Sequence, residues 1–310
     1  GTKRRPTMFG WCDATVHGST DRATKQLASG LAEGDGLPSN AVTRLLEAKA
    51  EVKAEVEYMG RAETLLEAAA RTCEGDDGAL VLKALIEAGA DVNAEATRAK
   101  ALLFNSEPPI SALVNRLYMG VLDKIHGSCF HSDYAANCRR ADFLRTLDQI
   151  TPMVRTLLAH RADPNRPSGV LHYYFKAIKD YFTADHPLDA KKRLEFTSIL
   201  LDGGARVVPS DKWCSFHVAC EMHLSDADVH VDIMRRLMTA GGAEQLNTAK
   251  QLSGEEEDHP ERGPMPPLWR EVGAGNTKVA QYLISEGAEA PAGGIEEIAA
   301  SIKDKGGESH

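Results

Sequence analysis

Four residues of the kinds that bind transition metals lie close together near the middle of the chain: His126, Cys129, His131 and Cys138. Zinc takes imidazole nitrogens and thiolate sulfurs in four-coordinate sites, and a bound ion also stabilises a loop that is too long to order itself. The intervals between the four residues match none of the common zinc modules, however, and His131 follows Cys129 too closely for a comfortable shared chelate. The cluster therefore stays a weak candidate metal site, beside the alternative of an ordinary loop with surface histidines.

A second group, Cys214, His217, Cys220 and His223, recurs at every third residue. Steps of three on a helix rotate successive side chains away from one face, so the four side chains cannot converge on one ion. The spacing favours a helix in which these residues pack.

Sequence signatures of the common enzyme classes are not found in the chain. It carries no Gly-x-Ser-x-Gly, no Walker loop, no His-Glu-x-x-His and no dinucleotide fingerprint. The acidic run from Glu255 to Asp258 lies between glycine and proline, as expected of a solvated loop, although it could also contact a basic partner. We predict a protein without catalytic activity, cofactor or small-molecule substrate. An enzyme or zinc-binding protein that uses residues 126–138 is the remaining alternative.

The composition limits the classes of partner and compartment. Lys and Arg number 36 against 45 Asp and Glu, a net charge of −9, which argues against nucleic acid as a partner. No apolar run approaches the roughly 18 residues that mark a membrane span. Six cysteines are too sparse for a disulfide scaffold, so we expect free thiols in a reducing intracellular compartment. This would be the cytoplasm, or an organelle if a targeting sequence was removed before Gly1.

The elements that would position these residues are indicated by a recurring phrase, Leu-Leu/Ile-x-x-Gly-Ala. The Leu pair fits the apolar face of a helix, and the glycine ends that helix by entering the left-handed conformation at little steric cost. Lys49 and Arg161 replace the glycine in two copies, which should make those helix ends slightly poorer. The copies begin at Leu45, Leu85, Leu157, Leu200 and Leu283, with a sixth, looser copy from Leu237 to Ala243 that we interpret as carrying one extra residue.

Each phrase is preceded by a fragment that suits the start of another helix. The best examples are Glu63 to Ala70, Ser215 to Cys220 and Pro266 to Trp269. Weaker versions begin at Thr7, Pro109 and Val170. An inner helix followed by an outer helix forms a hairpin, and the recurrence of such a unit predicts a repeat architecture.

These fragments resemble the Thr-Pro-Leu-His-x-Ala opening of ankyrin repeats, and the phrase with its following Asn, as in Leu85 to Asn93, resembles their ending. The resemblance extends over about residues 7–290. It implies an all-α fold, an α-solenoid of helix–turn–helix repeats joined by β-hairpin-like extended segments, which we call fingers. It also places His217 at the repeat's usual His position, whose role in the family is a hydrogen bond that ties neighbouring turns.

Three asparagines, Asn93, Asn165 and Asn247, fall within the predicted fingers. Asparagine suits a turn because its side chain can bond to nearby backbone. We therefore expect these side chains to stabilise the turns in which they lie.

The spacing of the phrases departs from the family's repeat length of about 33 residues. We assign the excess to insertions between inner and outer helices at about 14–39, 119–141 and 177–191, and to enlarged fingers at 94–107 and 248–264. The longest interval holds either a degenerate extra repeat within 95–160 or one long insertion. We prefer the insertion, because 142–160 has the pattern of a single outer helix, bent at Pro152.

We therefore expect six irregular repeats and a C-terminal capping helix. The apolar spacing of 295–303 predicts this helix, which would cover the exposed face of the last repeat. The predicted boundaries are a repeat domain at 1–290, with repeats at about 7–53, 54–94, 95–166, 167–208, 209–247 and 248–290, and a capping helix and tail at 291–310.

The family resemblance implies protein–protein binding on the concave face that fingers and inner helices form. We expect a structural or scaffold subunit of a multi-subunit assembly, with a reversible regulatory adaptor for a peptide or domain as the alternative. Aromatic residues and Arg are common anchors of interfaces. The predicted contact residues are Arg98, Lys100, Phe104, Arg166, Arg206, Lys212 and Trp213.

Overall fold

The chain forms two compact units. A computed structural model describes residues 15–17, 21–32, 36–58, 61–97, 107–125, 133–166, 169–181, 189–208, 214–220, 226–249 and 265–306. Unit 1 comprises the chain up to Arg116 together with Arg145–Asp163, and unit 2 comprises Leu117–Leu144 together with the chain from Pro164 onward.

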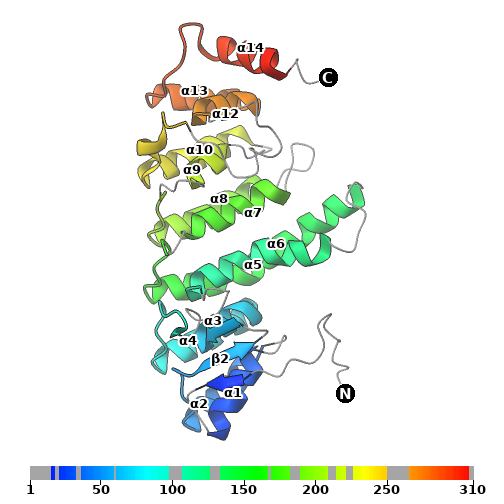
Figure 1. Cartoon of the computed structure of the whole chain (residues 1–310), viewed down its shortest axis with the longest axis vertical. Helices are drawn as coiled ribbons and strands as arrows, with labels where there is room; N and C mark the ends of the chain where they lie inside the picture. The colour runs from blue at the N-terminus through cyan, green and yellow to red at the C-terminus, as the bar shows by residue number, and fades with distance from the viewer. Residues whose placement is uncertain are drawn as a thin grey trace. The chain divides into compact units, whose positions relative to one another are not determined.

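Unit 1 stacks pairs of helices. The first pair is α1 (Arg22–Ala32) and α2 (Ser39–Glu47), and the second is α3 (Leu65–Thr72) and α4 (Gly75–Glu87). Helix α1 packs against α3, and α2 packs against α4, so the inner and outer helices form two layers (Figure 1). The buried core of this unit includes Leu27, Leu31, Leu66 and Leu85.

Unit 2 repeats the same arrangement. Its inner helices are α7 (Val170–Tyr181), α9 (Ser215–Cys220) and α12 (Pro267–Gly273), and its outer helices are α8 (Ala190–Asp202), α10 (Ala227–Thr239) and α13 (Thr277–Ser285). Successive inner helices contact one another, as do successive outer helices. The remaining pair, α5 (Pro109–Ile125) and α6 (Asp133–Ala159), is divided between the units. The predicted fold class, an all-α solenoid, is confirmed.

The recurring phrase closes each outer helix with one pair of backbone hydrogen bonds. After α4, the Gly89 N–H donates to the Ile86 carbonyl at 2.9 Å, and the Ala90 N–H donates to the Leu85 carbonyl at 3.0 Å. This is a Schellman motif, which satisfies carbonyls that the end of a helix leaves without partners. The same two bonds close α2, α6, α8 and α13.

The residue between those two bonds is left-handed in every one of these copies. Gly89, Gly204 and Gly287 have φ values of 99°, 92° and 99°, as predicted for glycine at a helix end. Lys49 and Arg161 hold the same conformation, with φ values of 66° and 65°. These two side chains therefore carry the steric strain that glycine avoids.

The sixth copy of the phrase carries no extra residue, so that part of the sequence prediction is wrong. Gly241, with φ 108°, is the left-handed residue after α10, and Gly242 follows it at the position of the alanine. A Cβ at Gly242 would lie 2.7 Å from the Leu237 carbonyl oxygen and 2.7 Å from Phe216 Cδ2. Only glycine fits there, and the short 3₁₀ helix η2 (Gly242–Gln245) starts at this point.

Part of the excess length that we assigned to insertions is helix. In the range 119–141, α5 extends to Ile125 and α6 begins at Asp133, so these two helices are longer than predicted. Helix α6 also continues through Pro152. In the first repeat the inner helix is α1, inside the expected insertion at 14–39, whereas the fragment that begins at Thr7 lies outside the described residues.

One finger is a β-hairpin, and it is extended by a strand that the sequence did not predict. Strands β2 (Glu55–Tyr58) and β3 (Arg61–Thr64) pair antiparallel, and β1 (Thr15–His17) pairs antiparallel with β2, with Val16 opposite Val56. The sheet order is β1-β2-β3. The described parts of the other fingers contain no further strand, so their expected hairpin form is not seen there.

Helix α14 (Gly294–Gly306) covers the end of unit 2. It contacts both helices of the last pair, α12 and α13, and its Ile298 is fully buried. This agrees with the capping helix predicted for 295–303. Among the described residues, no helix combines the length and the apolarity needed to cross a bilayer.

Candidate protein-binding surface

In α1, α3 and α9 the third residue of the helix ties it to the finger that leaves its own repeat. In unit 1 the Glu51 N–H donates to Thr24 Oγ1 at 2.8 Å, and the Glu107 N–H donates to Glu67 Oε1 at 3.1 Å. In unit 2 His217 Nε2 donates to the Thr248 carbonyl at 2.6 Å. The predicted structural role of His217 is confirmed, and chemically different side chains perform it in other repeats.

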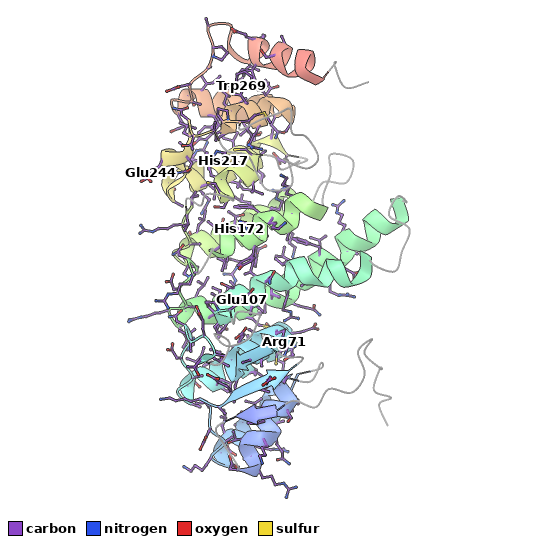
Figure 2. The ribbon with its side chains drawn as sticks, viewed as in Figure 1. Arg71, Glu107, His172, His217, Glu244 and Trp269 are labelled. Carbon is purple, nitrogen blue, oxygen red and sulfur yellow. The ribbon has the colours of Figure 1, made fainter. Side chains whose placement is uncertain are left out.

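His172 and Trp269 occupy this same position on α7 and α12. Figure 2 labels both, with His217 on the helix between them. Both are half-buried, whereas His217 is fully buried. Trp269 was part of a helix-start fragment in the sequence and was not predicted as a contact residue.

The three finger asparagines bind the next repeat along the chain. Asn165 Nδ2 donates to the Gly204 carbonyl at 3.1 Å, and Asn165 Oδ1 accepts the Arg206 N–H at 2.8 Å. Asn93 binds the Arg161 carbonyl and the Asp163 N–H in this way, and Asn247 binds the Gly287 carbonyl and the Glu289 N–H. These bonds reach beyond the turns in which the asparagines lie, which the sequence did not predict. Each asparagine fastens its finger to the helix end of the following repeat.

The structure describes two of the predicted contact residues, Arg166 and Arg206. Their backbones lie close together on neighbouring fingers. Arg166 directly follows Asn165, whose side chain holds the backbone of Arg206. Both arginines are exposed. They therefore project from two adjacent fingers of unit 2, at points that a side-chain hydrogen bond fixes relative to each other.

Val208 extends the same surface and was missed by the sequence analysis. It stands where the other fingers carry Asn93 and Asn165, three residues after the alanine of the phrase. Its side chain is 36% exposed, and its Cγ2 would lie 3.9 Å from a Cβ at Gly169. The missing asparagine was the signal that could have drawn attention to this residue.

A separate cluster of polar side chains in unit 2 is centred on the buried residue Glu271. His230 Nε2 lies 3.4 Å from Glu271 Oε1 and 3.2 Å from the Ala219 carbonyl oxygen, and Asn276 Nδ2 donates to Glu271 Oε2 at 2.8 Å. Burial raises the pKa of the Glu271 carboxyl well above its ordinary value, although the bonds from Asn276 and Cys220 oppose the shift. The Glu271 carboxyl therefore holds its proton more tightly than an exposed carboxyl does.

The same cluster contains Cys220, whose thiol is fully buried. Burial, followed by the charge of Glu271, raises the pKa of this thiol well above its ordinary value. A thiol with a raised pKa and no solvent access is a poor nucleophile, so the proximity of Cys220, His230 and Glu271 does not create a reactive cysteine.

The other predicted site residues lie outside the part of the chain that the structure describes. These are Arg98, Lys100, Phe104, Lys212 and Trp213, together with His126, Cys129 and His131 of the candidate metal cluster. Cys138 lies in α6, but its side chain is also outside the described part. Within the described residues, no group of three or more His, Cys, Asp or Glu side chains is placed to hold a metal ion.

The stacked helix pairs and their bonded fingers define a helical-repeat protein. No protein-family model and no curated protein matches the chain. Among solved structures, the human ASB11 ankyrin repeat domain is similar to this chain, with 14% sequence identity and a TM-score of 0.32. The match covers 88% of this chain and 88% of that one.

Proposed function

We propose that this chain is a non-catalytic scaffold of ankyrin-like repeats, whose fingers and inner helices bind a protein partner within a larger assembly. The proposal rests on how the chain uses the polar side chains that could otherwise take part in catalysis. Thr24, Glu67 and His217 bond to finger backbone, and the groups around Glu271 bond to one another inside the core. The chemistry of these residues thus maintains the stack, and the stack displays the fingers.

The outer helices of unit 2 support the same assignment, because their charged side chains pair with neighbouring repeats. Lys278 of α13 pairs with Asp228 of α10, and Arg236 of α10 lies 3.6 Å from Asp202 of α8. Arg235 lies over the ring of Tyr282 at 5.6 Å. Surface pairs of this kind contribute little stability each, but they occupy charges that a partner could otherwise bind.

Site-specific photo-crosslinking tests which surface holds the partner. A photoreactive residue would replace Val208 or Glu289 on the fingers, and Leu80 or Gln281 on the outer helices, in cells that express the full chain. All four positions are exposed. Protein adducts from the two finger positions and none from the outer helices are expected. Adducts from the outer helices alone, or no protein adduct at any position, would contradict the proposal.

A scaffold subunit and a reversible adaptor differ in how long each stays bound to its partner. Size-exclusion chromatography of an extract in high salt separates the two. We expect the chain to elute with a large complex. Elution as the free chain would contradict a permanent subunit and would indicate the adaptor.

A further inference from the structure

The basic patch of unit 2, defined as Arg166, Arg206 and Val208, is unlike the corresponding positions of the other repeats. The residue after the alanine of the phrase is acidic in four other copies, namely Glu51, Asp91, Asp163 and Glu289. In the second repeat this acid has a local role, because Asp91 Oδ1 accepts the Asn93 N–H at 2.9 Å. Arg206 has no acceptor atom on its side chain and cannot make that turn bond.

The geometry of the patch favours joint use of its two arginines. Asn165 holds Arg206 through its backbone, and Arg166 is the next residue in the chain. Arg166 and Arg206, both exposed, therefore place two positively charged side chains on neighbouring fingers of a protein of net charge −9.

Val208 adds an apolar side chain to the patch. At this position the second and third repeats use an asparagine to bind the following repeat, whereas here the fastening comes from the Val207 N–H, which donates to the Ala240 carbonyl at 2.9 Å. The side chain of Val208 is thereby left beside Gly169 and 36% exposed. A partner side chain that covered it would gain apolar burial next to the two charges.

We infer that the basic patch binds an acidic segment of the protein partner, with carboxylates on Arg166 and Arg206 and an apolar side chain against Val208. Planar guanidinium groups bind carboxylates through paired, charge-assisted hydrogen bonds, and an aliphatic neighbour excludes water from them. This inference rests on the proposed protein-binding function and adds the chemistry of the partner.

The test uses the full chain and a short fluorescein-labelled peptide in which glutamates surround two leucines. Fluorescence anisotropy would measure its affinity for the wild type and for the double variant R166E/R206E. The matched control is R44E/K53E, which changes the net charge equally at two exposed positions of unit 1. The affinity should fall about tenfold or more in R166E/R206E, because two charge-assisted contacts are lost, and should change less than about twofold in the control.

Two further arms make the test specific. A peptide with lysine in place of glutamate should not bind. V208D should lower the affinity for the glutamate peptide. The circular dichroism spectrum of R166E/R206E should match that of the wild type, which shows that the variant is folded. Equal affinity of wild type and R166E/R206E, binding of the lysine peptide, or no binding of the glutamate peptide at about 1 mM would overturn the inference. If photo-crosslinks still form at the fingers in that case, only the acidic partner is wrong. If they do not form, the proposed function fails as well.

Discussion

A single backbone angle decides how each outer helix ends. Gly89 takes a φ of 99° with no atom within 4 Å of the place where a Cβ would stand, so its role is conformational. Lys49 and Arg161 take the same region with a side chain attached. The left-handed helix end could be predicted from the recurring glycine. Lys49 and Arg161 could be aligned with that glycine, because each follows the Leu pair of the phrase at the same distance.

Replacing Lys49 or Arg161 with glycine should raise the free energy of unfolding. Relief of the left-handed Cβ clash is worth about 1–2 kcal/mol, and the greater backbone entropy of glycine in the unfolded chain reduces the gain to roughly 0.5–1 kcal/mol. Urea unfolding monitored by circular dichroism would measure this. Gly89→Ala is the control and should destabilise by a similar amount. Loss of stability in K49G and R161G would contradict the strain assigned to these positions.

Glu271 should make stability depend on pH. Burial raises its folded-state pKa well above the value of about 4.3 in an unfolded chain, so the folded state holds the proton more tightly. The resulting stabilisation is fully present below about pH 4.3 and is lost as the pH rises toward the folded pKa, at no more than about 1.4 kcal/mol per pH unit.

Glu271→Gln removes this titration and keeps the shape of the side chain. Thermal unfolding of wild type and E271Q across the acidic to neutral range would compare their slopes. We expect a flatter pH dependence for E271Q in the window above about pH 4.3. Parallel curves, or a wild type that gains stability relative to E271Q as the pH rises there, would show that the carboxyl is ionised in the core.

At the scale of elements, helices and fingers are joined by contacts that span a whole repeat. The helix–helix layers follow from the periodic Leu, Ile and Val residues, so the layers could be predicted from the sequence alone. The partner of Asn165 could not be predicted in the same way, because it lies about one repeat further along the chain and depends on how two fingers stack. Gly242 was misaligned for a similar reason: the space beside it is set by Phe216 of another helix.

Substitution of Asn165 tests whether the asparagines hold neighbouring repeats together. Asn165→Ala removes one donor and one acceptor and leaves the Gly204 carbonyl and the Arg206 N–H without this partner, so the free energy of unfolding should fall by about 1–2 kcal/mol. Asn165→Asp keeps the acceptor and should lose less. Chemical denaturation would measure both. An alanine variant as stable as the wild type would indicate that water replaces the bonds without loss.

Within each of the two compact units, neighbouring helix pairs contact one another: α1–α2 with α3–α4 in unit 1, and α7–α8, α9–α10 and α12–α13 in succession in unit 2. An all-α solenoid was predictable because its hydrophobic pattern recurs, whereas β1 and the early start of α6 were not, since each occurs once and follows no repeat. The basic patch was half predictable. Arg166 and Arg206 were selected by residue type, but their proximity depends on the fold, and Val208 was visible only through the asparagine that it replaces.

Hydrogen–deuterium exchange of the full chain, with and without the saturating glutamate peptide, tests whether the fingers of unit 2 bind a protein segment. We expect slower exchange of the backbone amides in 165–166 and 205–208, with the outer helices α8, α10 and α13 unchanged. R166E/R206E should lose this protection while R44E/K53E retains it. Protection confined to the outer helices, or no change in these finger residues at saturation, would contradict a protein-binding surface on the fingers.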